Sequence, residues 1–128
     1  MRLRRAALGG YLATVAGLML WPGIVLPETA IRRPDLIAHA GVFGLLTLLV
    51  IGARPAGEPT LGARNIAAGG VIALVLATGL EWMQGLPGIN RTRGVDDAIA
   101  NGVGVFGVCA SLLFIGAIDD QKREGRSS

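Results

Sequence analysis

The chain has 128 residues, of which 52% are hydrophobic and 16% are charged, with a formal net charge of +3. A soluble domain carries about 25% charged residues, so the composition excludes an ordinary soluble protein and indicates a one-domain integral membrane protein. Nucleic-acid binding is not indicated, because the arginines stand at the ends of apolar segments and form no continuous stripe. The one cysteine, Cys109, excludes an internal disulfide.

The first apolar segment, residues 6–26, follows a cluster of three arginines and carries no charge. A spanning helix needs about 20 residues, so this segment is long enough to cross a bilayer. Its length and the lack of a small-x-small cleavage site after it favour an uncleaved helix over a signal peptide. Gly9, Ala13 and Gly17 lie four residues apart on one face, which predicts close packing against another helix.

Three further helices are predicted at 36–53, 66–86 and 98–118. Short connections predict antiparallel neighbours, and therefore an all-α, four-helix transmembrane bundle formed by residues 1–118. The charged segment 119–128 is predicted to be a disordered cytoplasmic tail. Lysine and arginine number three at the N-terminus, two in the middle loop and three in the tail, against four on the other side. The positive-inside rule then places both termini in the cytoplasm.

Polar side chains recur near one end of three predicted helices, as three pairs that each share a helix face: Asp35 with His39, Glu81 with Gln84, and Asp97 with Asn101. On the predicted boundaries all six lie in one shallow layer near the outer surface of the membrane. Ionisable residues inside a membrane are a functional-site hypothesis by default. The sequence therefore predicts a polar pocket that opens outward.

Glu81 and His39 are the candidate catalytic residues of this pocket. A carboxylate in hydrocarbon needs a partner, so Glu81 could act as a general acid or base or bind a cationic group. The alternative is a salt bridge to Arg91 or Arg93 that holds the loop. His39 could move protons near neutral pH or serve only as a structural hydrogen-bond partner.

The remaining candidates would bind substrate. The guanidinium of Arg91 offers a planar fork for phosphate or carboxylate, whereas Arg93 is assigned to head groups at the membrane surface. Four further residues would orient the ligand: Asp35, Gln84, Asp97 and Asn101. Their alternative roles are a helix cap for Asp97 and interhelical hydrogen bonds for the two amides. The glycines of the last helix, Gly102, Gly104 and Gly107, are predicted to permit close helix packing rather than to touch ligand.

No metal and no cofactor are predicted. A single histidine argues against zinc, which usually takes several nitrogen or sulfur ligands. The carboxylates could hold Mg²⁺ or Ca²⁺ only if a full shell of oxygens were available, and nothing in the sequence supplies one. The chain has no Walker-type glycine loop and no Gly-x-Ser-x-Gly motif, and Ser111 has no base in view.

The polar residues also form a motif set. Asp35-x-x-x-His39 is followed by Glu81-x-x-Gln84, then by Arg91, then by Asp97-x-x-x-Asn101-x-x-Gly104. This order resembles the VanZ-like membrane proteins over the second to fourth helices. Two positions depart from the family pattern, because Leu36 replaces a lysine and Ala40 replaces a phenylalanine.

The resemblance implies a small multi-pass protein of the bacterial cytoplasmic membrane, in a family linked to resistance against teicoplanin-type glycopeptides. We expect a pocket that binds or acts on a lipid-linked or cell-envelope substrate, with membrane lipids as partners. The rival interpretation is a non-enzymatic subunit or lipid-binding module whose polar network is structural. A small transporter is disfavoured, because the polar layer is shallow and no charge continues it through the membrane.

Overall fold

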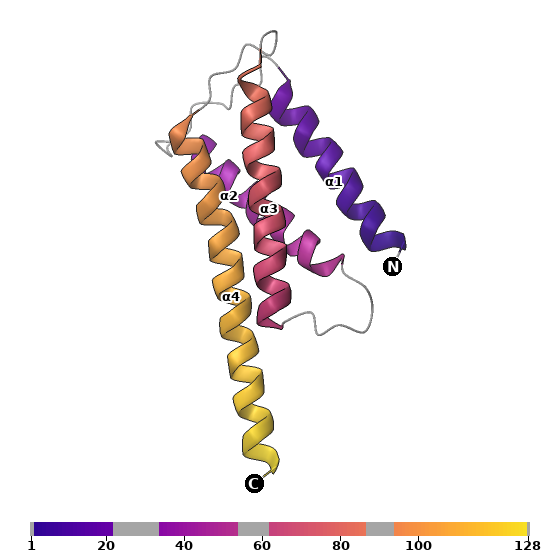
Figure 1. The fold of residues 1–128 in the computed structure, drawn as a ribbon, viewed down its shortest axis with the longest axis vertical. Coiled ribbons are helices and arrows are strands. Elements are labelled where there is room, and N and C mark those ends of the chain that lie inside the picture. The colour runs from indigo at the N-terminus through magenta and orange to yellow at the C-terminus, as the bar shows by residue number, and fades with distance from the viewer. Residues whose placement is uncertain (1, 22–33, 54–61, 87–93, 128) are drawn as a thin grey trace.

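The computed structural model of the chain describes residues 2–21, 34–53, 62–86 and 94–127. These residues form four α-helices: α1 (Arg2–Leu20), α2 (Pro34–Gly52), α3 (Ala63–Gln84) and α4 (Val95–Ser127). Helices that follow one another in the chain run in opposite directions (Figure 1). The predicted all-α fold of four helices is thereby confirmed, and no strand occurs in the described parts of the chain.

The helix ends follow ordinary local rules. Proline is tolerated at the first position of a helix, which is where Pro34 stands in α2. Asp35 in α2, and Asp96 and Asp97 in α4, lie in the first turns, where a carboxylate complements the positive end of the helix dipole. At the other end of α3, the N–H of Gly85 donates to the carbonyl of Trp82 and tightens the last turn.

Helix α4 is longer than predicted. The charged segment that was expected to be a disordered tail continues α4 as far as Ser127, and Figure 1 shows this end of α4 extending beyond the other helices. Extending an existing helix avoids the unfavourable nucleation step, and this segment is rich in strong helix formers such as Lys122. Arg126 in the last turn complements the negative end of the helix dipole.

Helices α2 and α3 lie at the centre of the bundle. Both contact α1 on one side and α4 on the other, whereas no contact joins α1 to α4 in the described residues. Buried side chains from all four helices form one hydrophobic core: Val15, Met19, Phe43, Leu46, Val50, Ala73, Ala77 and Val105. The position of α2 and α3 therefore lets each of them bring a polar end next to a neighbouring helix.

Three glycines allow the helices to approach closely. A Cβ on Gly104 would collide with the backbone carbonyl of Ala40, which places α4 directly against α2. A Cβ on Gly69 would collide with the side chain of Ile51, and one on Gly70 would lie 2.8 Å from the sulfur of Cys109. Small residues at such positions are typical of helix packing in membranes.

Other glycines predicted to permit close packing do not do so in the described structure. A Cβ on Gly102 or Gly107 of α4 would meet no atom within 4 Å, and the same holds for Gly9 and Gly17 of α1. The packing prediction is therefore right for Gly104 and wrong for these four positions. Spacing alone placed them on a helix face but did not show which face meets a neighbour.

Three helices are long and apolar enough to cross a membrane: α2, α3 and the Val95–Asp119 part of α4. Their outer faces carry large exposed apolar side chains, such as Val75 on α3 and Phe106 and Phe114 on α4. A surface this apolar fits contact with lipid rather than with water. The predicted first span, 6–26, ends outside the described residues, so the crossing of α1 stays a prediction.

Candidate functional site

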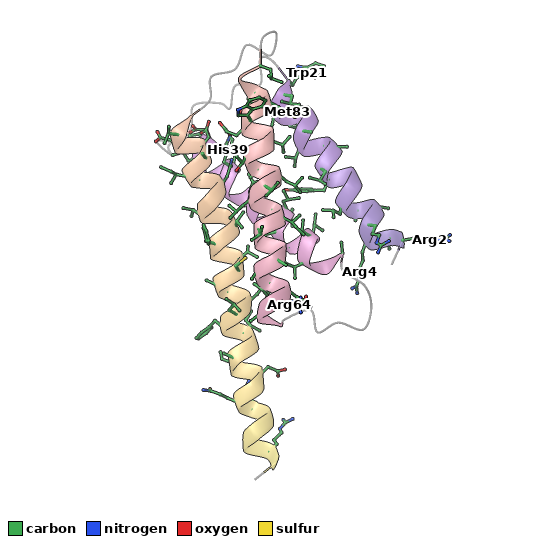
Figure 2. The ribbon with its side chains drawn as sticks, in the orientation of Figure 1. Arg2, Arg4, Trp21, His39, Arg64 and Met83 are labelled. Carbon is green, nitrogen blue, oxygen red and sulfur yellow. The ribbon has the colours of Figure 1, made fainter. Side chains whose placement is uncertain are left out.

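The polar residues predicted to form the site gather at one end of the bundle. This end is formed by the C-termini of α1 and α3 and the N-termini of α2 and α4 (Figure 1). His39 lies at this end, as do Met83 and Trp21, whereas Arg2, Arg4 and Arg64 lie at the opposite end (Figure 2). The described structure therefore separates a polar end, which holds the candidate site, from a basic end.

A hydrogen bond joins α2 to α4 at the polar end. Nδ1 of His39 lies 2.9 Å from Oδ1 of Asn101. Because an amide oxygen can only accept, Nδ1 must carry the proton and donate. His39 is half-buried and Asn101 is buried, so the bond is largely shielded from solvent. This contact gives both residues a structural role as an interhelical link.

The close approach of backbone at Gly104 explains why this hydrogen bond can form. Ala40, whose carbonyl faces Gly104, follows His39 directly in α2. Gly104 lies three residues after Asn101, about one helical turn away on a similar face. The glycine thus brings the two helix backbones near enough for an imidazole and a short amide side chain to meet.

Gln84 forms a second link, between α3 and α1. Its Nε2 donates to the backbone carbonyl of Met19 at 3.2 Å, and the glutamine is only 3% exposed. Met19 belongs to the last turn of α1, where carbonyl groups lack partners within the helix. Gln84 therefore satisfies a helix end and fixes α1 to the bundle.

Glu81 is the buried carboxylate of the polar end, at 9% exposure. Its Oε1 accepts a hydrogen bond of 3.2 Å from the backbone N–H of Gly94, the residue that precedes α4. Its Oε2 is buried and has no hydrogen-bond partner among the described residues. One oxygen thus holds the start of α4, and the other is left without a donor.

A cavity of about 150 Å³ lies beside Glu81, between α3 and α4. Five lining residues come from α3 and three from α4: Leu74, Ala77, Thr78, Glu81, Trp82, Ala98, Asn101 and Gly102. Glu81 is the charged member of this lining, and Asn101 and Thr78 add an amide and a hydroxyl. A small, mostly apolar cavity with a few convergent polar groups is the usual form of a ligand site.

The predicted site residues are brought together only in part. Glu81 and Asn101 line the cavity, and His39 joins it indirectly through Asn101. In the described structure the hydrogen bond of His39 goes to Asn101, and no hydrogen bond joins His39 to Glu81. Arg91 and Arg93 lie outside the described residues, so their predicted roles stay predictions.

The two remaining aspartates occupy first turns rather than the cavity lining. Asp35 is half-buried at the start of α2. Asp97 lies close to Gly94, because a Cβ on that glycine would be 2.8 Å from its Oδ2. Because α4 begins at Val95, Asp97 lies inside the first turn and does not stand at the cap position predicted for it. Its carboxylate complements the positive end of the helix dipole. In the described residues no group of three His, Cys, Asp or Glu side chains could hold a metal ion.

Sequence reasoning missed several features of the site. The backbone N–H of Gly94 and the carbonyl of Met19 carry no sequence signal, because every residue but proline has both groups. Thr78 and Ala98 line the cavity without belonging to any motif. Only helical spacing could have pointed to the hydroxyl, because Thr78 and Glu81 are three residues apart and so lie on a similar face of α3.

Comparison of the chain with protein-family models, curated proteins and solved structures gave no match. The VanZ-like resemblance therefore stays a prediction from motif order and spacing.

The link between His39 and Asn101 can be tested with a double-mutant cycle. We expect His39→Ala and Asn101→Ala to show a coupling of about 1 kcal/mol, near the range of polar side-chain pairs between membrane helices. Reversible unfolding in mixed micelles measures each free energy of unfolding. As the control, His39→Ala with Gln84→Ala should be additive, because Gln84 bonds a different helix pair. Additivity of the first pair would contradict the interhelical role.

Proposed function

We propose that this chain is a VanZ-like protein of the bacterial cytoplasmic membrane that binds the polar part of a lipid or lipid-linked envelope molecule at Glu81. Two findings support a membrane-embedded site. Three helices are long and apolar enough to span a bilayer, and Glu81 lines a cavity between two of them. The motif order from Asp35 to Gly104 supports the family assignment.

The observation that carries the proposal is the buried Oε2 of Glu81, which has no hydrogen-bond partner among residues 2–21, 34–53, 62–86 and 94–127. A buried polar atom without a hydrogen bond costs about 1–3 kcal/mol, and more when the group is charged. Such atoms are uncommon in folded proteins and call for an explanation, such as a functional role. A ligand that donates to Oε2 from the adjacent cavity would remove the cost in the bound state.

Binding is better supported than proton transfer. Acid–base catalysis by Glu81 with His39 needs a path along which a proton can pass between the two side chains. In the described structure, however, Nδ1 of His39 is hydrogen-bonded to Asn101. Oε1 of Glu81 likewise already accepts a hydrogen bond from the N–H of Gly94. The two interhelical links and the bond of Oε1 to Gly94 follow the rival interpretation, in which the network is structural. Oε2 of Glu81 is the atom that has no partner among the described residues.

The orientation of the site follows from charge. The basic residues of the described structure, such as Arg2, Arg4 and Arg64, lie at the end opposite His39 (Figure 2). The positive-inside rule places a basic end in the cytoplasm. In this proposal the cavity at Glu81 lies near the outer surface, where envelope precursors are used.

Glu81→Gln separates the proposal from the structural interpretation. The glutamine oxygen can still accept from Gly94, so we expect an unchanged or higher melting temperature together with at least about tenfold less lipid retained on the purified protein. Native mass spectrometry of protein released from membranes measures the retained lipid. Asp96→Asn is the control, because it removes an exposed carboxylate that does not line the cavity.

Two outcomes would contradict the proposal. If Glu81→Gln lowers the abundance and the melting temperature as much as it lowers lipid retention, the carboxylate is structural. If Asp96→Asn reduces lipid retention equally, the effect is one of general charge at this end of the bundle and not of a site at Glu81.

A further inference from the structure

We propose that the cavity at Glu81 recognises a primary ammonium group, of the kind carried by the head group of an aminophospholipid. The inference rests on the proposed function and specifies its ligand. It follows from four properties of the cavity: the charge around it, the donors and acceptors in its lining, its size, and its position at the membrane surface.

The charge of the described cavity lining is negative, because Glu81 is its charged residue. The carboxylates of Asp35, Asp96 and Asp97 lie outside this lining, in the first turns of α2 and α4. The described arginines and Lys122 belong to the first turns of α1 and α3 and the far end of α4. A ligand group in the cavity would therefore meet the carboxylate of Glu81, which attracts a cation and repels an anion.

The N-terminus of α4 does not reverse this preference. A helix N-terminus attracts anions through its free N–H groups and its dipole. Here the N–H of Gly94 already donates to Oε1 of Glu81. Asp96 and Asp97 also place two carboxylates in the first turn. The start of α4 thus already holds one carboxylate of the protein, that of Glu81, and two more carboxylates lie in its first turn, which would repel a bound phosphate.

The donor and acceptor pattern selects the kind of cation. Oε2 of Glu81 is an acceptor in need of a donor, and Oδ1 of Asn101 is already bonded to His39. A primary ammonium carries N–H donors and can bond the carboxylate directly, whereas a trimethylammonium carries none. Quaternary ammonium groups are bound by cages of aromatic rings, and Trp82 is the aromatic residue of this lining.

The volume of the cavity and its distance from the helix end fit the head group of a lipid rather than a whole lipid molecule. Sites that enclose drug-sized ligands measure about 300–1,000 Å³, whereas this cavity measures about 150 Å³. Glu81 lies three residues before the end of α3, which is about 4.5 Å at 1.5 Å per residue. A small cavity this close to the helix end can hold an aminoethyl group while the rest of the ligand stays outside.

The cavity also borders the outer face of the bundle. Trp82 is 62% exposed, and Thr78 and Ala98 are exposed on the facing helices. Tryptophan is enriched at the level of lipid head groups. A lipid could therefore enter between α3 and α4 from the bilayer, with its acyl chains on the exposed apolar side chains of α4, such as Ile99 and Val103.

The test compares lipids that differ in one group. Wild-type protein and Glu81→Gln are placed in bilayer nanodiscs that contain equal amounts of phosphatidylethanolamine, phosphatidylcholine and phosphatidylglycerol, and native mass spectrometry counts the lipid retained. We expect wild-type protein to retain phosphatidylethanolamine at least about tenfold over phosphatidylcholine, which differs in the methylation of its nitrogen. Glu81→Gln should retain the two equally.

The other outcomes show whether the ammonium inference fails alone or together with the proposed function. Preferred retention of phosphatidylglycerol that depends on Glu81 would overturn the ammonium inference and leave the proposed function intact. Lipid retention that Glu81→Gln does not change would overturn both. A parallel sample in phosphatidylcholine nanodiscs receives free ethanolamine. Binding of ethanolamine that depends on Glu81, without preference for phosphatidylethanolamine, would support the ammonium and assign it to a soluble source.

Discussion

Replacing Gly104 with alanine should destabilise the bundle, and by more than the same replacement at Gly107 of the same helix. The added Cβ would collide with the carbonyl of Ala40, and a backbone atom cannot move aside as the end of a side chain can. Overpacking of this kind costs about 1–3 kcal/mol. Moving α2 away from α4 would also stretch the hydrogen bond between His39 and Asn101. Reversible unfolding in mixed micelles should show the loss.

Gly107→Ala is the matched control, since it adds the same methyl group to the same helix. A Cβ there meets no atom within 4 Å, and alanine is about 1 kcal/mol more favourable than glycine inside a helix. We therefore expect Gly107→Ala to be as stable as the wild type or more stable. Equal stability of the two variants would show that α2 and α4 do not approach at Gly104.

The second large effect is expected from filling the cavity while Glu81 stays intact. Gly102 lines the cavity, and a Cβ on it meets no atom within 4 Å. Gly102→Leu therefore adds an isobutyl group at the cavity wall, with a Cβ that meets no backbone atom. We expect lipid retention to fall at least about tenfold with no loss of thermal stability, as measured by native mass spectrometry and a melting curve.

Gly107→Leu controls for helix propensity and for added apolar surface. It makes the same chemical change in the same helix, at a position that is open and does not line the cavity. Retention should stay at the wild-type level in this variant. If both leucines reduce retention equally, lipid contacts the outer face of α4 in general. If neither does, the cavity is not where the lipid head group binds.

The all-α fold was predictable because each helix carries a long apolar stretch, and α2 also has a local start signal in Pro34 with Asp35. The polar end was predictable because helical spacing fixes which residues share a face, as for Glu81 and Gln84. The continuation of α4 was missed, since the charge of the segment after Ile118 was interpreted as a sign of disorder. Charged residues are also good helix formers when a helix already precedes them.

The partners of the polar residues were not predictable from spacing. His39 and Glu81 were predicted to be the catalytic residues of one pocket, whereas in the described structure the hydrogen bond of His39 goes to Asn101. Which residues meet across a helix interface depends on the rotation of each helix, and Gly104 sets that rotation through a contact with Ala40. Backbone groups such as the N–H of Gly94 can join a site without any sequence signal.

The most direct test of a ligand site at Glu81 is an experimental density map of the protein in a bilayer that contains phosphatidylethanolamine. We expect density for a non-protein group between α3 and α4, with a donor about 2.7–3.2 Å from Oε2 of Glu81. A map in which both oxygens of Glu81 bond protein groups, with the space beside them closed by side chains, would contradict it.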